Sequence, residues 1–351
     1  MTVNKALFLV QSPLHIHNAH EAIIKFGITQ STFLVVTSKH NLKWSNMMIA
    51  ALPVNANSLF CERNDFDLEE CTKGYTKHIP WLIKQSFDFV FFSDSRLYIF
   101  VDVVNALQNS NTFLMDDGAG IISSVQHIKD KGLYFDISKS SSVTRQQQIE
   151  KVKDKYGLLN TKSAKYNLFT AFDFASCDQF IVYQNPMTKM SHTHKNSNQN
   201  QVLFLGQPMV NDGYISNRSY IQEMNAIINS YPEMEVLYLA HPREEKANVA
   251  EIQRSCNIRL IETDMTVEQY LLNIARPPAI VSSFYSAALW YVAKFQRGIK
   301  VNAHKLDFEL LYSVNKSSMS RSSYLSMPSI IDLVYQHYKL RMNVIEPLRH
   351  E

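Results

Sequence analysis

The sequence predicts an α/β protein with two Rossmann-like, doubly wound domains whose strand ends face a central cleft. Three observations support this fold class. Short, continuously apolar runs alternate with helix-length segments, which is typical of a parallel sheet covered by helices on both faces. The alternation stops at a polar stretch, residues 185–200, and then starts again. A chain of 351 residues also exceeds the size of one comfortable hydrophobic core.

The first domain, residues 1–184, contains five of the apolar runs. We expect strands at ALFLV (6–10), TFLVV (32–36), FDFVFF (87–92), TFLM (112–115) and QFIVY (179–183). The helix-length segments are 14–26, 41–51, 76–86 and 97–108. Residues 130–170 are rich in Lys, Ser and Gln, and we expect a mobile excursion over the surface there.

The polar stretch NPMTKMSHTHKNSNQN (185–200) predicts a linker, and residues 201–351 form the second domain. Its expected strands are VLFLG (202–206), EVLYLA (235–240), IRLIE (258–262), AIVSS (279–283) and IKVNA (299–303). Helices are expected near 217–231, 244–255, 266–275 and 286–296, and residues 329–340 predict an amphipathic terminal helix.

Composition indicates an ordinary globular protein, with 46% hydrophobic and 19% charged residues. The formal charge of +3 is too small to indicate a nucleic-acid partner. The four cysteines are widely spaced, which favours reduced thiols. No apolar run is long enough for a signal peptide or a membrane span. We therefore expect a cytoplasmic protein. Peripheral contact with the inner membrane and homo-oligomerisation both stay open.

Ligands of doubly wound sheets bind beyond the carboxyl ends of the strands, so residues that follow each predicted strand are site candidates. After the first strand, Ser12 can cap the next helix and Pro13 suits its first turn. Ser12 and His15 can equally face the cleft. Of the nearby histidines, only His17 and His20 have the spacing of one helix face, and no carboxylate or cysteine completes a metal-ligand set. We expect no metal here.

The stretch FLMDDGAG (113–120) places two carboxylates directly after a buried strand. Repulsion between Asp116 and Asp117 tends to raise one pKa, and a carboxylate in a cleft is a natural general base for a hydroxyl group. Gly118 allows a tight turn and leaves room for a substrate. A turn with a helix cap is the alternative interpretation. The sequence does not decide which carboxylate would be the base.

Comparable positions in the second domain carry a glycine, a histidine and two serines. Gly206 ends one predicted strand, and His241 follows the next, held extended by Pro242. A histidine can carry or donate a proton near neutral pH. Ser282 and Ser283 lie between a strand and a helix, where hydroxyl and free N–H groups can hold an anion, although ordinary helix capping explains them too.

A fifth candidate of this domain, Glu268, lies in the first turn of a predicted helix. Thr266 and Gln269 have the spacing of a capping box around it. The Glu268 carboxylate can complement the helix dipole, or it can accept two hydrogen bonds from a ribose diol.

The DDG (116–118), HP (241–242) and SS (282–283) motifs, in this order and after these strands, resemble the three short motifs of bacterial sialyltransferases. Those enzymes have the two-Rossmann-domain fold called GT-B. The opening QSPLH (11–15) and the chain length are most similar to glycosyltransferase family 52 and to bacterial polysialyltransferase-like proteins. The resemblance extends from residue 6 to about residue 300.

The resemblance implies a role for each matching residue. Asp116 would take the proton of the acceptor hydroxyl, and His241 would contact the donor phosphate and assist the departure of CMP. The remaining residues would bind the donor: Ser282 and Ser283 its phosphate, Glu268 the ribose and Gly206 the cytosine. Some relatives carry a lysine just before the HP motif, where this chain has Leu239 and Ala240. Phosphate charge must then be balanced by another group, such as Arg243.

We therefore expect an inverting, metal-independent sialyltransferase that needs no cofactor. It would move sialic acid, or a related nonulosonic acid, from a CMP-activated donor to a hydroxyl of a bacterial surface glycan, such as lipooligosaccharide, O-antigen or capsule. CMP carries one phosphate, so no diphosphate requires a metal ion, and the Asp-x-Asp match at 65–67 does not follow a strand. The alternatives are a GT-B glycosyltransferase or epimerase that uses a UDP-sugar, and a non-catalytic polysaccharide-assembly protein.

Overall fold

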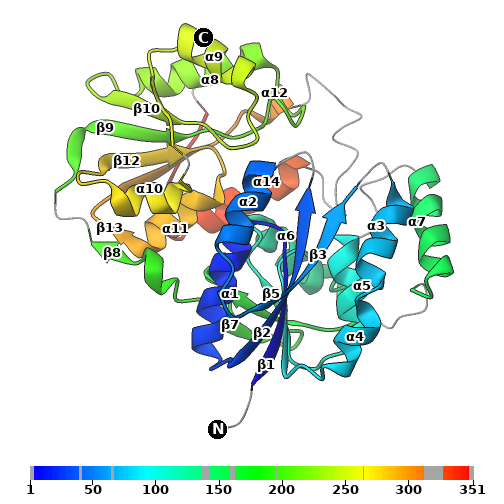
Figure 1. Cartoon of the computed structure of the whole chain (residues 1–351). Helices are drawn as coiled ribbons and strands as arrows, with labels where there is room; N and C mark the ends of the chain where they lie inside the picture. Colours follow the sequence, from blue (N-terminus) through cyan, green and yellow to red (C-terminus); the bar gives the residue numbers. More distant parts are fainter. Residues whose placement is uncertain are drawn as a thin grey trace. The chain divides into compact units, whose positions relative to one another are not determined.

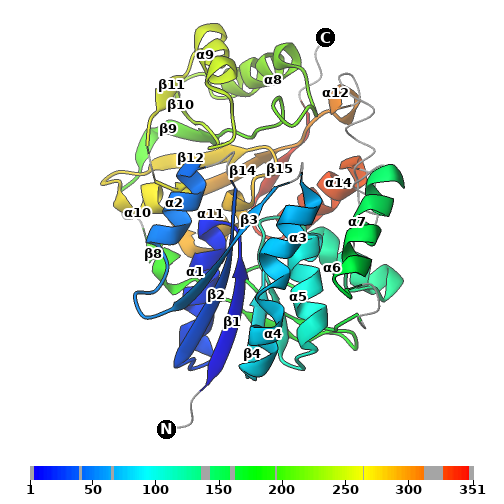
Figure 2. The ribbon, with the colours of Figure 1, turned by 45° about the vertical axis from the view of Figure 1, so that its right-hand side comes forward.

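The predicted alternation of strands and helices is present in both halves of the chain (Figures 1 and 2). The computed structural model describes residues 4–38, 42–64, 67–135, 143–158, 163–193, 196–263, 265–311 and 327–347. The chain divides into two compact units, Met1–Met187 and Thr188–Glu351. The division lies inside the segment predicted as a linker. The expected cleft between the domains stays a prediction.

The strands of the first unit form a parallel sheet in the order β3-β2-β1-β4-β5-β6-β7. Their bounds are β1 (Lys5–Val10), β2 (Gln30–Ser38), β3 (Asn57–Arg63), β4 (Phe89–Phe92), β5 (Thr112–Met115), β6 (Asn167–Thr170) and β7 (Val182–Gln184). The order reverses between β1 and β4. The connections on the two sides of this reversal leave toward opposite faces of the sheet. Doubly wound sheets bind their ligands at such a reversal.

Helices cover both faces of this sheet. Their bounds are α1 (Pro13–Lys25), α2 (Leu42–Ala50), α3 (Leu68–Thr76), α4 (Ile79–Lys84), α5 (Tyr98–Leu107), α6 (Gly120–Lys131) and α7 (Val143–Lys155). Helices α1 and α2 lie on one face, and α3, α4 and α5 lie on the other (Figures 1 and 2). On the α1 face, Phe8 stacks between Phe33 and Phe91, with ring centroids 4.9 Å and 5.0 Å away. Alternate residues of neighbouring strands thus build one aromatic layer.

The second unit contains another parallel sheet, in the order β11-β10-β9-β12-β14-β15. Its strands are β9 (Asn198–Leu205), β10 (Glu235–Leu239), β11 (Arg259–Ile261), β12 (Pro278–Ser283), β14 (Lys300–His304) and β15 (Asn343–Ile345). A short pair, β8 (His192–Thr193) and β13 (Gln296–Arg297), lies outside this sheet. The helices are η2 (Thr188–Met190), α8 (Asn217–Asn229), α9 (Lys246–Ser255), α10 (Val267–Asn273), α11 (Ala287–Phe295), α12 (Phe308–Leu311) and α14 (Met327–Tyr338). The order reverses between β9 and β12.

The prediction of two doubly wound α/β domains is confirmed, but several elements differ from expectation. The segment 76–86 is not one helix, since α3 ends at Thr76 and α4 begins at Ile79. The region 130–170 contains α7 and β6, while its residues 136–142 and 159–162 lie outside the described part of the chain. The segment 185–200 contains η2, β8 and the start of β9.

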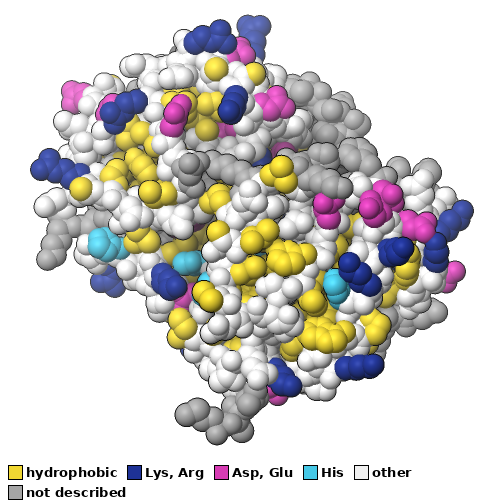
Figure 3. Space-filling model, in the orientation of Figure 1, with side chains coloured by type: hydrophobic (Ala, Val, Ile, Leu, Met, Phe, Trp, Pro, Cys, Tyr) yellow, Lys and Arg dark blue, Asp and Glu magenta, His cyan; other side chains and the backbone are white. Residues whose placement is uncertain are grey.

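On the visible face of the molecule, charges are mixed rather than segregated (Figure 3). On the face shown in Figure 3, Lys and Arg side chains are interspersed with Asp and Glu side chains. This distribution fits the modest net charge of +3. Within the ranges that the structure describes, no helix combines the length and apolarity needed to cross a bilayer.

Candidate active site

The carboxyl ends of four neighbouring strands carry the candidate residues of the first unit. The strand register aligns Leu9 of β1 with Phe92 of β4, and Phe92 with Leu114 of β5. Met115 of β5 is aligned with Phe169 of β6. Residues that follow these strands therefore meet at one edge of the sheet, across the reversal of strand order.

Asp116 is directed into the protein. It is 0% exposed, and its carboxylate accepts hydrogen bonds from the Thr170 hydroxyl and, at 2.8 Å, from the Ala171 N–H. The backbone carbonyl of Asp116 accepts a bond of 3.0 Å from the Asn18 side chain. These contacts join the ends of β5 and β6 to α1. The Asp116 carboxylate therefore has no contact with solvent in this structure.

Asp117 is directed the other way and is 27% exposed. One carboxylate oxygen lies 2.9 Å from His15 Nε2, and the other accepts a bond of 2.9 Å from the Arg96 guanidinium. Gly118 has a φ of +64°, the left-handed conformation that glycine adopts without strain. The turn at Gly118 thus follows two adjacent aspartates, of which one is buried and the other is partly exposed.

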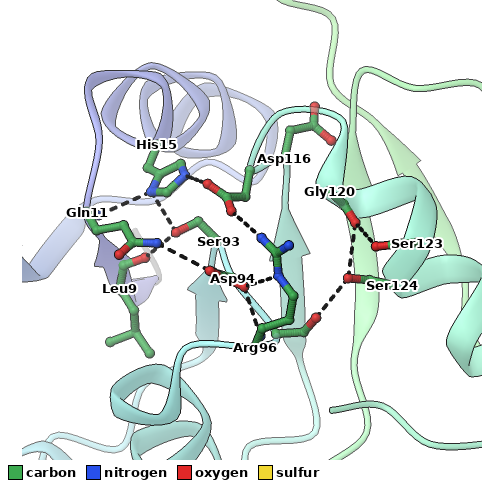
Figure 4. A network of polar contacts seen from close by, with 12 residues as sticks. Leu9, Gln11, His15, Ser93, Asp94, Arg96, Asp116, Gly120, Ser123 and Ser124 are labelled. Carbon is green, nitrogen blue, oxygen red and sulfur yellow. Dashed lines mark hydrogen bonds and ion pairs between the residues drawn. The ribbon is translucent and has the colours of Figure 1, made fainter. Parts of the chain in front are cut away.

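The hydrogen bonds of His15 define its neutral tautomer (Figure 4). The backbone N–H of Gln11 donates to Nδ1 over 3.1 Å, and Ser93 Oγ lies 2.8 Å from the same nitrogen. A backbone N–H can only donate, so Nδ1 is the acceptor and Nε2 carries the hydrogen. The buried imidazole therefore donates its Nε2–H to the Asp117 carboxylate. Ser12 caps α1 through the His15 N–H, at 3.3 Å, which fixes the turn that carries this ring.

Arg96 completes the network from the end of β4. Its Nε donates to Asp94 over 2.9 Å (Figure 4). Its terminal nitrogen donates to Asp117 over 2.9 Å. Burial alone would raise the pKa of Asp117, but the interactions with His15 and then with Arg96 outweigh burial and lower that pKa. The carboxylate is therefore ionised and oriented at neutral pH. The mutual repulsion expected between Asp116 and Asp117 does not raise the pKa of Asp117.

The second unit brings its candidates together in a comparable way. Leu205 of β9 is aligned with Leu239 of β10, and Phe204 of β9 is aligned with Ser282 of β12. The residues that follow these three strands thus share one edge of the sheet, at its reversal of strand order. Gly206, His241 and Ser283 all lie there.

His241 is held by its own turn. Its backbone N–H donates to Glu244 over 2.6 Å, and its Nδ1 accepts the N–H of Arg243 over 3.1 Å. Because Nδ1 is occupied by a donor, the neutral ring carries its hydrogen on Nε2. Burial, and then the charge of Arg243, lower the pKa of His241 to about 4. At neutral pH this side chain is a neutral hydrogen-bond donor rather than an imidazolium ion.

Gly206 has no space for a side chain. An added Cβ would lie 2.3 Å from a carboxylate oxygen of Glu244 and 2.5 Å from the Tyr238 hydroxyl. Tyr238 donates to Glu244 over 2.7 Å, and its hydroxyl is 3.0 Å from that of Tyr220. Burial raises the pKa of Glu244 to about 7, against the opposing effect of its hydrogen bonds from Tyr238 and His241.

Both serines are 0% exposed. The Ser283 hydroxyl donates to the Leu205 carbonyl over 2.7 Å, which ties β12 to β9. Gln207 Oε1 accepts the Tyr285 N–H over 3.0 Å and so positions the loop that leads into α11. The Ser283 hydroxyl thus shapes this edge from inside the sheet. The prediction that the serines lie between a strand and a helix was wrong, because both belong to β12 and Ser286 is the residue that precedes α11.

Glu268 lies in the first turn of α10, where the capping box formed by Thr266 and Gln269 is present as predicted. Burial raises the pKa of Glu268, while its own backbone N–H and Thr266 oppose the rise. Pro242 is exposed beside His241.

Five residues of these two networks were not predicted from the sequence: Arg96, Ser93 and Asp94 in the first unit, and Tyr238 and Glu244 in the second. The segment SDSR (93–96) directly follows a predicted strand, so the rule that singled out Asp116 could have found it. Glu244 is three residues beyond His241, and only the folded turn reveals its contact. Across the described residues, no group of three His, Cys, Asp or Glu side chains could hold a metal ion. The expectation that the Asp-x-Asp match does not follow a strand was wrong, because β3 ends at Arg63, two positions before Asp65. Asp65 and Phe66 themselves lie outside the described residues.

Comparison with known proteins adds a family match. A family model described as Alpha-2,8-polysialyltransferase (POLYST) matches residues 6–305. A comparison with curated protein sequences found no match.

Solved structures share the architecture at low identity. UGT2 of Phytolacca americana, in complex with UDP-2-fluoroglucose and pterostilbene, is 12% identical, with 99% of this chain and 86% of that chain covered and a TM-score of 0.50. S. aureus MnaA with UDP is 13% identical, with 86% and 79% covered and a TM-score of 0.50. An α/β-galactoside α-2,3-sialyltransferase from Photobacterium phosphoreum is 10% identical, with 99% of both chains covered and a TM-score of 0.49. The first two likenesses support the two-domain GT-B fold and nothing beyond it.

Proposed function

The chain belongs to the alpha-2,8-polysialyltransferase family, and on that premise we propose that it transfers sialic acid, or a related nonulosonic acid, from a CMP-activated donor to a hydroxyl of a bacterial surface glycan. The family match confirms the resemblance inferred from the three short motifs, and the chain is a glycosyltransferase. The description of the family makes a sialylated acceptor and an α-2,8 linkage the first to test.

One observation carries the catalytic part of the proposal: Asp117 is a partly exposed carboxylate, held between His15 and Arg96. In our proposal Asp117 accepts the proton of the acceptor hydroxyl as that oxygen attacks the anomeric carbon. His15 and Arg96 keep the carboxylate ionised and oriented, which a general base requires before the reaction begins. A single displacement inverts the anomeric centre. Asp117 thereby takes the role that the motif resemblance had given to Asp116, whose buried contacts are structural.

On the donor side, we assign His241 to the departing phosphate. Its Nε2–H would donate to a phosphate oxygen and stabilise the charge that develops as CMP leaves. The nucleotide would be held by Gly206, Glu268, Pro242 and the loop after Ser282 and Ser283. No step in this scheme requires a metal ion. Peripheral contact with the inner membrane and self-association belong to the proposal as secondary features.

A donor and acceptor screen tests this function. The purified protein is incubated with CMP-N-acetylneuraminic acid and with sialylated oligosaccharide, lipooligosaccharide or capsule fragments, and the products are measured by mass spectrometry. We expect a mass increase of one nonulosonic acid per transfer, and no transfer from UDP-sugars. Transfer from a UDP-sugar alone would contradict the donor assignment.

A further inference from the structure

Glu244 lies at the centre of the second-unit edge, although no motif includes it. One carboxylate oxygen accepts the backbone N–H of His241 over 2.6 Å, and the other accepts the Tyr238 hydroxyl over 2.7 Å. The same side chain occupies the space that any side chain at Gly206 would need. Glu244 thus contacts residues from the ends of both β9 and β10.

The hydrogen-bond network around Glu244 is complete in either protonation state. When the carboxylate is ionised, it accepts from both His241 and Tyr238. When it is protonated, one oxygen still accepts the His241 N–H, and the new O–H donates to the Tyr238 oxygen. Tyr238 can then donate to the hydroxyl of Tyr220, which lies 3.0 Å away. Protonation therefore removes a negative charge while the turn keeps its bonds.

The charged and titratable groups around Glu244 are few in the described part of the second unit. Tyr238 on β10 and Tyr220 on α8 have pKa values raised mainly by burial, so both stay neutral hydroxyls. His241 is neutral, and the Tyr285 pKa is also raised by burial. Arg243 pairs with Asp212 at 3.2 Å, which balances its charge locally.

We propose that Glu244 is a positioning residue for the anionic donor: it fixes the His241 turn, occupies the space beside Gly206, and takes up a proton when a nucleotide phosphate binds at this edge. The inference rests on the proposed function, because that function places the phosphate beside His241. An ionised carboxylate next to an incoming phosphate would repel it, and proton uptake from solvent removes the repulsion.

The direction of the pH effect follows from the pKa of Glu244, which is raised to about 7 without ligand. A bound phosphate raises that pKa further. Well below pH 7 the group is mostly protonated before binding, so binding takes up little. Above pH 7, binding takes up a proton and affinity falls as pH rises, by at most about tenfold per pH unit for one linked proton.

Calorimetric titration with CMP tests the proposal between pH 6 and 9, in pairs of buffers with different ionisation enthalpies. The wild type should take up a fraction of a proton near pH 8. Glu244→Gln resembles the protonated form, since its amide can accept from His241 and donate to Tyr238. This variant should lose the uptake and keep the low-pH affinity at every pH. Tyr238→Phe removes a hydrogen bond that lowers the pKa of Glu244. In this variant the pH at which proton uptake is half-maximal should therefore move upward.

Glu245→Gln is the matched control, because Glu245 is exposed, directly precedes α9 without a side-chain capping bond, and lies one residue away. It should behave as the wild type does. If wild type and Glu244→Gln bind CMP with the same proton uptake, the role of Glu244 is overturned while the proposed function stands. If the wild type binds no CMP at any pH, both proposals are overturned together.

Discussion

At the scale of single residues, burial distinguishes the adjacent side chains of Asp116 and Asp117. Asp116 bonds to Thr170 and Ala171, which are 54 and 55 residues away in the sequence, and Asp117 bonds to His15 across 102 residues. The sequence could place both aspartates at the end of a strand. It could not show which one turns inward, because the deciding partners come from β6 and α1.

The close fit around Gly206 gives a prediction at the same scale. In Gly206→Ala the methyl group would lie 2.3 Å from Glu244, so that carboxylate must move and release the His241 turn. We expect CMP affinity, measured by calorimetry, to fall by about tenfold or more, which corresponds to one lost hydrogen bond to a charged group.

Gly74→Ala is the control for that change. Gly74 lies inside α3, where the nearest atom to an added Cβ is Cys61 Sγ at 3.6 Å, in ordinary contact. This variant should bind CMP normally and gain about 0.5–1 kcal/mol of stability from its better helix propensity. Normal CMP binding by Gly206→Ala as well would contradict the described packing.

At the scale of elements, the sequence predicted best where its signals are local. The start of α1 was predicted from Ser12 and Pro13, and the α10 capping box from Thr266 and Gln269; both are present. Long apolar runs such as β1 and β12 were also found. The missed strands β6 and β15 have only four and three residues, and β3 is an edge strand with a mixed pattern. Such strands depend on pairing partners that lie elsewhere in the chain.

The cap of α1 links an element to the site. Ser12→Ala removes the hydroxyl that accepts the His15 N–H, so we expect a loss of about 1 kcal/mol in the free energy of unfolding by urea. The loosened turn should also displace the His15 ring from Asp117 and lower the transfer rate severalfold.

Ser216→Ala provides the comparison. Ser216 caps α8 through the Ser219 N–H at 3.0 Å, in the other unit. It should lose similar stability and retain its transfer rate. Equal loss of transfer in both variants would show that general destabilisation, and not the position of His15, explains the effect.

At the scale of the whole molecule, the two units share one architecture, and in our proposal they carry different chemistry. Each sheet reverses its strand order once, and most candidate residues follow strands near that reversal, whereas Glu268 lies in α10, after the edge strand β11. The sequence predicted both sheets because parallel, doubly covered strands are continuously apolar. The division of the chain lies inside the polar stretch 185–200, although that stretch also contains η2, β8 and the start of β9.

Nucleotide choice is the prediction that belongs to this scale. CMP should raise the melting temperature of the whole chain, because it binds the folded state and not the unfolded one, and UDP should do so much less. Transfer activity should stay within about a factor of two in excess EDTA, since no proposed step uses a Lewis acid. Equal stabilisation by UDP, or a loss of activity that added Mg²⁺ or Mn²⁺ restores, would contradict this account.

The central claim is that Asp117, and not Asp116, is the general base, and the transfer rate of two matched variants tests it most directly. Asp117→Asn should fold normally, bind CMP as the wild type does, and transfer at least about a hundredfold more slowly. Asp116→Asn should unfold more easily, by about 1–3 kcal/mol, because its amide cannot accept both bonds from Thr170 and Ala171. Its folded fraction should still transfer at a substantial rate. Near wild-type transfer by Asp117→Asn would contradict the assignment.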